Sequence, residues 1–266
     1  MTTPAGHSAP ARAGSAEGLT LEVRGLQVAY GANLAVAGVD ARVAPGAIVG
    51  VIGPNGSGKS TLLKAIAGVL RPHSGEIMLG GAPIRQEATR IAFVPQREEV
   101  NWDFPVTARD VVMMGRYRAL GWLRWPGKAD RERADAALER LGLGGLGHRH
   151  ISQFSGGQQQ RIFLARALVQ EPRLVLLDEP FTGIDVHNRA IVHELIRAFA
   201  DDGVTVLVAT HDLDEVRATT THVLCLNRDM VAFGPTPTTF TPANLRATFG
   251  GQMAMFEQVP IFERAP

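Results

Sequence analysis

The sequence predicts an α/β fold built around a mostly parallel β-sheet. Residues 47–52, 174–177 and 204–209 form short, predominantly apolar runs, which are typical of strands buried on both faces of a sheet. The first two runs are followed, at residues 62–67 and 185–200, by segments whose apolar residues recur at helical spacing. Strands that alternate with helices in this way favour a parallel sheet.

Composition narrows the class of protein. The 266 residues suit one large or two small domains, and 45% apolar against 20% charged residues is enough for a sizeable core. The 27 basic and 26 acidic residues nearly cancel, so nucleic acid is not expected as a partner. The single cysteine, Cys225, excludes an internal disulfide and is expected to be a buried apolar residue in a strand. No apolar run approaches the ~18 residues of a membrane-spanning helix, and no signal peptide is expected.

A glycine-rich loop joins the first buried strand to its helix. Residues 53–61 read GPNGSGKST, in the strand–loop–helix context that the G-x-x-x-x-G-K-[ST] pattern requires. Its glycines permit turns that point backbone N–H groups at phosphate oxygens, and the helix start adds partial positive charge. Lys59 can reach the β- and γ-phosphates, and the Ser60 hydroxyl can bind Mg²⁺. The loop therefore predicts a phosphate-binding site; a glycine-rich turn with a chance lysine is the alternative, which the flanking strand and helix disfavour.

The N-terminal part divides into a tail and short strands. Residues 1–18 are rich in small residues and proline without periodicity, and we expect a disordered tail. Residues 21–23 and 26–30 alternate apolar and polar side chains, as half-buried strands do, and residues 36–43 are predicted to form another strand. Tyr30 fits ordinary packing in such a strand, and a platform for a purine ring is the alternative.

Between residues 97 and 157 the pattern becomes helical. Ala134, Ala137, Leu138 and Leu141 follow the spacing of one buried helix face, and charged residues occupy the opposite face. We expect a helical insertion of about sixty residues in the α/β chain.

A second capped helix start follows this insertion. Ser155 precedes Gly156, Gly157 and a helical run that Pro172 ends. Serine is a favourable N-cap, and the two glycines leave the first amides of the helix open, so the segment is a second candidate anion site. A capped helix start on its own is often only structural.

Polar side chains follow the ends of the predicted strands. Asp178 and Glu179 follow one buried strand, His211 follows the next, and Gln96 follows a short apolar strand. Because parallel sheets bind ligands at the carboxyl ends of their strands, the paired carboxylates fit metal binding and base chemistry, and the histidine is a candidate ligand contact. A helix-capping or surface pair is the alternative for the carboxylates, and a solvated amide is the alternative for Gln96.

The C-terminal part carries fewer signals. Two short strands, at residues 223–226 and 230–233, are predicted to close the fold. Residues 234–266 contain five prolines and no long periodic segment, so we expect an extended, partly ordered tail. The remaining histidines show no metal-ligand spacing.

Taken together, these motifs resemble those of the ATP-binding cassette (ABC) ATPases. GPNGSGKS resembles the Walker A loop, and LVLLDEP at residues 174–180 resembles Walker B. FSGGQQQR at residues 154–161 resembles the LSGGQ signature, with Phe154 where leucine is usual. TGID at residues 182–185 resembles the D-loop, in which SALD is commoner. The resemblance covers about residues 19–234, with the motifs in the family's order.

The resemblance implies a fold, an activity and a set of site residues. The implied fold is α/β, a P-loop ATPase core with a mostly parallel sheet, an N-terminal antiparallel β subdomain, a helical subdomain at about 97–157 and a C-terminal extension at 235–266. Glu179 is implied as the base for water in ATP hydrolysis, with Gln96 as the Q-loop residue and His211 as the switch histidine. Mg²⁺ would be held by Ser60, Gln96 and Asp178. The residues implied to bind ATP are Tyr30, Gly53, Pro54, Asn55, Gly56, Ser57, Gly58, Lys59, Ser60, Thr61, Ser155, Gly156, Gly157, Gln158 and Asp185.

One region resembles a narrower group. NWDFPVT at 101–107 and DVVMMGRY at 110–117 are similar to segments of the ATPase subunits of manganese and zinc importers, a group that also handles iron. Trp102 and Phe104 are expected to be exposed at a docking surface, the alternative being that the rings fold into the helical core.

The resemblance also implies partners. It implies a homodimer, peripheral at the cytoplasmic face of the cell membrane, in which ATP on one copy is closed over by residues 155–157 of the other. Integral membrane permease subunits would bind this dimer and connect it to an extracytoplasmic metal-binding protein. Another cargo, such as haem or an iron chelate, is an alternative. A soluble ABC ATPase acting on nucleic acid or ribosomes is disfavoured by the single cassette, the lack of a heptad run and the balanced charge.

Overall fold

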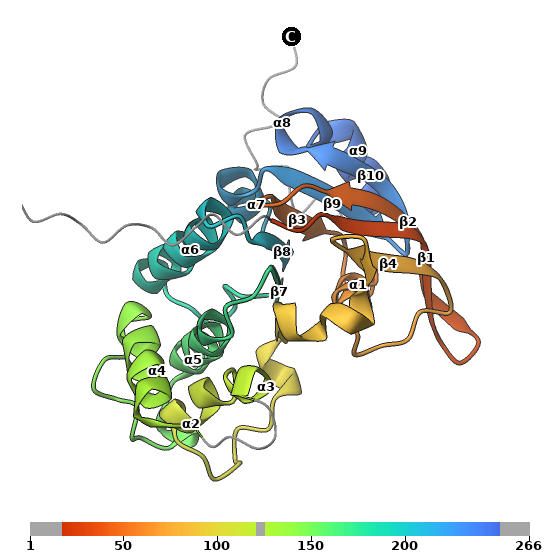
Figure 1. Cartoon of the computed structure of the whole chain (residues 1–266). Coiled ribbons are helices and arrows are strands. Elements are labelled where there is room, and N and C mark those ends of the chain that lie inside the picture. Colours follow the sequence, from red (N-terminus) through yellow and green to blue (C-terminus); the bar gives the residue numbers. More distant parts are fainter. Residues whose placement is uncertain (1–17, 121–125, 251–266) are drawn as a thin grey trace, which may run out of the picture.

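The described part of the chain folds into two β-sheets and a set of helices (Figure 1). The computed structural model describes residues 18–120 and 126–250. The larger sheet has the strand order β10-β9-β3-β8-β7-β6. Parallel pairing joins β3 (Ile48–Ile52), β6 (Ile91–Val94), β7 (Leu174–Asp178), β8 (Thr205–Ala209) and β9 (His222–Asn227), and β10 (Asp229–Pro235) adds an antiparallel edge. The mostly parallel sheet predicted from the apolar runs is therefore confirmed.

The smaller sheet is antiparallel and comes from the N-terminal part of the chain. Its strand order is β2-β1-β4-β5, with β1 (Leu21–Tyr30), β2 (Asn33–Val43), β4 (Ser74–Leu79) and β5 (Ala82–Pro83). Helix α1 (Lys59–Ile66) contacts strands of both sheets, and its Leu62 and Leu63 share one core with them. The helix that follows the phosphate loop is thus packed between two sheets.

Alternation along the central strands explains why their sequences are apolar throughout. In β7, Leu174 and Leu176 belong to the core that contains α1, whereas Val175 and Leu177 belong to the core on the other face. Successive side chains of a strand point to opposite faces, so a strand covered on both sides needs apolar residues at every position.

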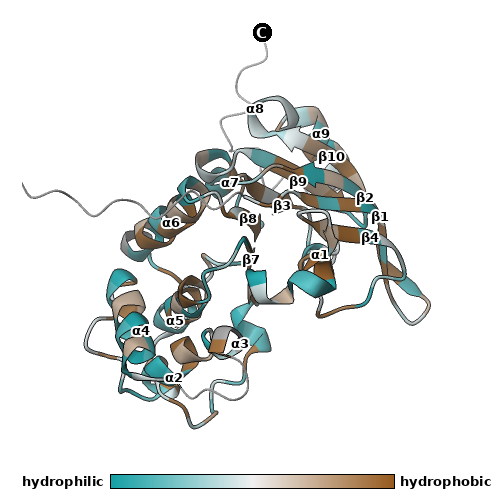
Figure 2. Cartoon of the chain, in the orientation of Figure 1, coloured by the Kyte–Doolittle hydropathy of each residue, from teal (hydrophilic) through white to brown (hydrophobic). Residues whose placement is uncertain are grey.

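Helices α5 (Gly156–Val169) and α6 (Val186–Asp201) pack on the second face of the large sheet (Figure 1). Helices α2 (Ala108–Met113) and α4 (Lys128–Arg140) pack on α5 and on each other, and α3 (Tyr117–Leu120) follows α2. The predicted face of α4 is buried at Ala134, Ala137, Leu138 and Leu141. The outer face of α4 is charged, and much of this helix therefore has the hydrophilic colour in Figure 2. The central strands are hydrophobic in the same view. Three short 3-10 helices are η1 (Ile84–Arg90), η2 (Arg97–Glu99) and η3 (Ile151–Gln153).

The C-terminal part differs from the expected extended tail. After β10 the chain forms α8 (Thr236–Thr239) and α9 (Pro242–Phe249). Phe240, Leu245 and Phe249 pack in one cluster with Ile52 of β3 and with residues of α7 (Leu213–Thr219). The expectation of an extended chain was wrong for residues 236–249, because these helices are too short to show periodicity and are stabilised by packing on the sheet. The tail expected at 1–18 and the remainder of 251–266 lie outside the described residues, apart from Gly18.

Cys225 lies in the same cluster and is fully buried, as predicted. Burial raises the pKa of its thiol to about 11, so the side chain behaves as a small apolar residue.

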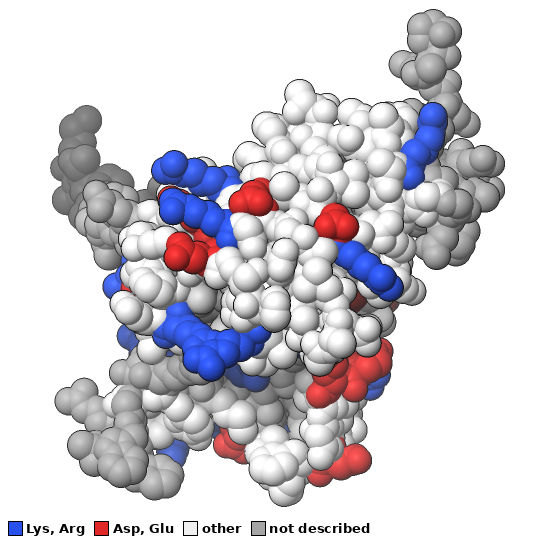
Figure 3. Space-filling model, turned by 90° about the vertical axis from the view of Figure 1, so that its right-hand side faces the viewer, with Lys and Arg blue, Asp and Glu red and all other residues white. Residues whose placement is uncertain are grey.

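The surface shows no segregation of charge on the face drawn in Figure 3. Basic and acidic side chains are interspersed there, with broad areas that carry neither. Within residues 18–120 and 126–250, no helix is long and apolar enough to cross a bilayer.

The packing of α9 gives a test of the fold. Leu245→Ala should lower the free energy of unfolding by about 2–5 kcal/mol, because it leaves a cavity in a fully buried position. Arg246→Ala, at an exposed position of the same helix, should change it by less than about 0.5 kcal/mol. Urea unfolding of the full chain measures both, and equal effects would show that α9 does not belong to the cooperative unit.

Candidate functional site

The phosphate loop is held against β2 by close backbone packing. Gly58 has φ 101°, and a Cβ atom there would lie 2.5 Å from the carbonyl oxygen of Ala35. Only glycine fits such a position without strain. Helix α1 begins at the next residue, and no side chain in the described part of the chain caps it. Its first N–H groups therefore remain available to an anion, as predicted for this loop.

Lys59 places a buried cation inside the loop. Its Nζ donates to the carbonyl oxygens of Gly53 (2.8 Å) and Pro54 (3.1 Å). Burial lowers the pKa of Lys59, and the negative charges of Glu179 and Asp178 oppose that shift. The ammonium group thus lies where it can exchange carbonyl partners for phosphate oxygens.

The loop lines a pocket of about 390 Å³ at the carboxyl end of the parallel strands. Its lining residues are Ala35, Asn55, Gly56, Ser57, Gly58, Lys59, Ser60, Thr61, Gln96 and Glu179. The structure thus brings Gln96 and Glu179, predicted from separate strand ends, to the predicted loop. Ala35 was missed, since nothing in the sequence distinguishes an alanine that approaches the loop through its backbone.

Asp178 is a buried carboxylate with the Ser60 hydroxyl nearby. The residue is fully buried, and neither carboxylate oxygen makes a hydrogen bond of normal geometry to the described residues. Burial raises its pKa, and the nearby Ser60 hydroxyl opposes the shift. An unpaired buried carboxylate is costly unless a cation accompanies it. Oxygen donors are the ligands that Mg²⁺ prefers, so Asp178, Ser60 and Gln96 fit this ion.

Glu179 and His211 form a pair at the same end of the sheet. Both carboxylate oxygens of Glu179 lie 2.9 Å from Nδ1 of His211. Glu179 has φ 50°, a left-handed conformation that non-glycine residues rarely adopt and that is frequent at functional sites. The Glu179 side chain is 12% exposed and that of His211 63% exposed. A carboxylate with an accessible imidazole partner therefore faces the phosphate pocket.

The remaining predicted ATP-binding residues do not line this pocket. Tyr30 ends β1 with 50% of its surface exposed. Ser155 caps α5, as predicted, and accepts a hydrogen bond from the Gln158 amide at 3.4 Å while Gln158 Oε1 accepts one from the Ser155 amide at 3.0 Å. None of these is among the described lining residues, so a single copy brings together only part of the predicted site.

A family model described as ABC transporter matches residues 36–182. The chain belongs to the ABC transporter family. The manganese transport system ATP-binding protein of Synechocystis sp. is 46% identical over 236 residues, which cover 88% of this chain and 91% of the relative. The zinc transport system ATP-binding protein of Treponema pallidum is 45% identical over 240 residues, covering 90% of each chain. The resemblance drawn from the motifs is thereby confirmed.

Solved structures of ABC proteins have the same fold. An inward-facing ABC transporter of metal-chelate type matches with a TM-score of 0.75 and 33% identity over 86% of this chain and 88% of that chain. A dimeric ATP-binding cassette bound to ADP and phosphate matches with a TM-score of 0.72 and 26% identity over 81% of this chain and 98% of that chain. The predicted α/β fold with a helical part is therefore confirmed as that of ABC ATPase cassettes.

The ABC signature segment packs on the D-loop within the chain. A Cβ atom at Gly157 would lie 2.8 Å from the carbonyl oxygen of Gly183, so this contact requires glycine. Asp185 caps α6 and accepts hydrogen bonds from the Asn188 amide (3.1 Å) and side chain (2.6 Å). These bonds to Asn188 lower the pKa of the Asp185 carboxyl. The two ABC motifs are thus held side by side, at the starts of α5 and α6.

The expected docking loop is only partly exposed. Trp102 packs edge-on against Phe163 with the ring centroids 5.1 Å apart, and its indole donates to the Arg97 carbonyl oxygen at 2.9 Å. The expectation of an exposed Trp102 was therefore wrong, because α5 offers its ring an aromatic partner. Phe104 is 56% exposed, as expected. Arg97, missed from the sequence, also donates to Gln159 of α5 at 3.1 Å and so connects the Q-loop to the signature helix.

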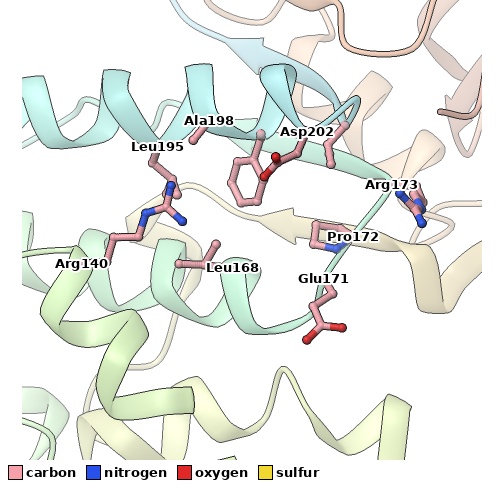
Figure 4. Close-up of a pocket in the computed structure, with 10 residues that line it drawn as sticks. Arg140, Leu168, Glu171, Pro172, Arg173, Leu195, Ala198 and Asp202 are labelled. Carbon is pink, nitrogen blue, oxygen red and sulfur yellow. The ribbon is translucent and has the colours of Figure 1, made fainter. Parts of the chain in front are cut away.

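A second cavity, of about 300 Å³, lies at the other end of the strands (Figure 4). Pro172 and Arg173 precede β7, and Val204 precedes β8. Figure 4 shows it between α5 and α6, with the Arg140 side chain near Leu195. This cavity therefore lies at the opposite end of the strands from the candidate phosphate pocket and shares no lining residue with it.

Asp178→Asn tests the unpaired carboxylate. Folding raises the pKa of Asp178 above its ordinary value of 3.8. The folded protein therefore holds the proton more tightly than the unfolded chain, and the free energy of unfolding decreases as pH rises from 3.8 through the folded pKa. Without nucleotide at pH 7, the free energy of unfolding of the variant should therefore be about 1–3 kcal/mol higher than that of wild type. The difference should become smaller at lower pH, because the wild-type carboxyl is then also neutral. The Mg²⁺ dependence of ATP affinity should weaken.

Thermal and urea unfolding at several pH values, with and without MgATP, measure this. Glu179→Gln is the matched control: that carboxylate has a partner in His211, so its loss should give little stabilisation. A lower stability for Asp178→Asn across the pH range would show that the carboxylate has partners and no need of a cation.

Proposed function

We propose that the chain is the ATP-hydrolysing subunit of an ABC transporter that imports a divalent metal ion, manganese or zinc. The observation that carries the ATPase assignment is the meeting of three features at one sheet edge: the phosphate loop, the buried Asp178 and the Glu179–His211 pair. The cargo is supported by the manganese and zinc relatives, which match along about nine-tenths of this chain.

The proposed chemistry assigns one task to each side chain. Mg²⁺, when bound with ATP, neutralises phosphate charge. Ser60 and Gln96 would hold this ion directly, and Asp178 mainly through water. Glu179 takes a proton from the attacking water, and His211 contacts the γ-phosphate while it orients Glu179. Catalysis then consists mainly of positioning and charge neutralisation, as is general for phosphoryl transfer.

A second copy is proposed to complete the nucleotide site. Ser155 is exposed and, with Gln158, lies outside the lining of its own pocket. In a head-to-tail homodimer, the α5 start and Asp185 of one copy would face ATP bound on the phosphate loop of the other, and Tyr30 would stack on adenine. The similar dimeric cassette bound to ADP and phosphate supports this assembly.

The helical part offers the proposed contact with the membrane. Phe104, Met114 and Tyr117 are large apolar side chains exposed by 56%, 37% and 48%, respectively. Exposed apolar residues close in sequence favour a partner surface. We assign this surface to integral membrane permease subunits, which would hold the cassette peripherally at the cytoplasmic face and connect it to an extracytoplasmic metal-binding protein. Nucleic acid is not expected as a partner.

A chelated metal is the second candidate cargo. The similar inward-facing transporter is of the metal-chelate type and matches this chain at 33% identity. Uptake assays with free and chelated metal distinguish the two cargoes.

The first test replaces the proposed base. Glu179→Gln keeps the shape of the side chain but cannot accept the proton, so hydrolysis should fall by about 10²–10⁴-fold while MgATP still binds. With MgATP the variant should accumulate as a dimer on a sizing column. A hydrolysis rate near that of wild type would remove Glu179 from the assigned role.

The second test addresses coupling to transport. Phe104→Ala should leave ATP affinity, hydrolysis by the isolated chain and melting temperature nearly unchanged, because the ring is exposed. Manganese or zinc uptake in a complemented strain should fall roughly fivefold or more, since an exposed aromatic anchor is lost from the interface.

Val69→Ala is the matched control, because Val69 is an apolar residue 64% exposed outside the helical part. Uptake equal to wild type in the folded Phe104→Ala protein would place the docking surface elsewhere.

A further inference from the structure

A polar cluster between α6 and α7 has no part in the chemistry assigned so far. It consists of Arg189 and His193 on α6, Glu215 on α7 and Asp212, which caps α7. Arg189 and His193 are four residues apart, so both project from the same face of α6. Glu215 and His193 are only 12% and 18% exposed.

Each oxygen of the Glu215 carboxylate has a donor from α6. Arg189 Nη1 lies 3.1 Å from Oε1 of Glu215, and His193 Nε2 lies 2.6 Å from Oε2. The other ring nitrogen of His193 bonds to the Thr219 hydroxyl at 2.9 Å. Glu215 is therefore held at two points, which fixes its orientation as well as its distance from α6.

The α6 side of the cluster continues into the loop that follows the proposed base. The Phe181 ring, two residues after Glu179, stacks on His193 with the ring centroids 4.7 Å apart. Arg189 Nε donates to the carbonyl oxygen of Ile184 at 3.4 Å, beside Asp185. Arg189 and His193 thus contact the loop that connects Glu179 to the D-loop aspartate.

The α7 side continues into the loop that carries the histidine. Asp212 follows His211 directly, and its Oδ1 accepts the amides of Asp214 and Glu215 at 3.1 and 3.2 Å. Its Oδ2 lies 3.5 Å from Arg189 Nη1. Any shift of α7 against α6 would therefore move His211 relative to Glu179.

We infer that Glu215 is a positioning residue: held by Arg189 and His193, its carboxylate fixes the His211 loop against the loop from Glu179 to Asp185. This inference rests on the proposed ATPase function. The cluster lies outside the lining of the phosphate pocket. It therefore affects the alignment of Glu179 and His211 during hydrolysis, and the affinity for nucleotide does not depend on it.

The test compares Glu215→Ala with wild type in the purified full chain. MgATP affinity should change by less than about twofold, whereas kcat should fall by about tenfold or more, since a small misplacement of catalytic groups is enough for such a loss. Asp135→Ala is the matched control, because it removes a 2.7 Å ion pair with Arg109 in the helical part. Its melting temperature should fall by less, because this pair is more exposed, and its kcat should stay near wild type.

A double-mutant cycle with His211→Ala separates positioning from general stability. Under single-turnover conditions, Glu215→Ala should lower the rate by less than about twofold when His211 is already absent, because the group that it positions is gone. Equal rate losses with and without His211 would overturn the inference. So would a kcat near wild type for Glu215→Ala.

Two further arms keep the outcomes distinct. If Glu215→Ala does not fold, Arg189→Ala is measured in the same cycle. Arg189 is 36% exposed, so its loss should be tolerated better, and its removal also breaks the ion pair with Glu215. If the wild-type chain does not hydrolyse MgATP, the proposed function is contradicted. If the wild-type chain is active, the rate losses caused by Glu215→Ala with and without His211 test the positioning role separately.

Discussion

The site depends on how α1 is fixed between the two sheets. Its apolar residues pack on strands of the antiparallel sheet on one side and on β7 and β8 on the other. This packing holds the start of the helix, and with it the phosphate loop, at the carboxyl edge of the parallel strands. The close approach of Gly58 to Ala35 then sets the loop against β2. An anion site made of backbone amides needs such support, because main-chain groups bind a phosphate only if the turn that carries them is rigid.

Burial of opposite charges at that edge costs folding free energy. Lys59 and Asp178 are both largely removed from water, and burial disfavours the charged form of each. Their mutual attraction recovers part of this cost. In the proposed function, triphosphate and Mg²⁺ would offset the remainder, because phosphate oxygens would pair with Lys59 and the cation with Asp178. Such an exchange of stability for function is usual at active sites. The left-handed Glu179 adds backbone strain at the same point.

The sequence was sufficient where one local pattern decides the structure. Apolar runs identified β3, β7 and β8, helical spacing identified the buried face of α4, and motif order identified the loop, Gln96 and Glu179 as neighbours. The sequence was insufficient where contacts between distant segments determine the local structure. Helices α8 and α9 form because Ile52 and the α7 residues offer a surface to Phe240 and Leu245. Trp102 turns inward because Phe163 lies in the adjacent helix. The contact of Glu215 with His193 joins residues 22 positions apart on separate helices, and neither residue type stands out in the sequence.

The position of α5 and α6 suggests why these distant contacts matter. Both helices begin at the same place, where Gly157 lies against Gly183, and these starts carry the segments proposed to face a second copy. From there α5 connects to the Q-loop through Gln159 and Arg97, and α6 connects to the His211 loop through Arg189 and Glu215. Gln96 and His211, which are proposed to act at the γ-phosphate, are thus connected by short polar contacts to the helix starts that are proposed to face a second copy. Arg97 bonds to Gln159 of α5, and Arg189 of α6 bonds to Glu215 of α7. We therefore expect a small rotation of α5 or α6 to change the geometry around Gln96 or His211 without repacking the apolar core.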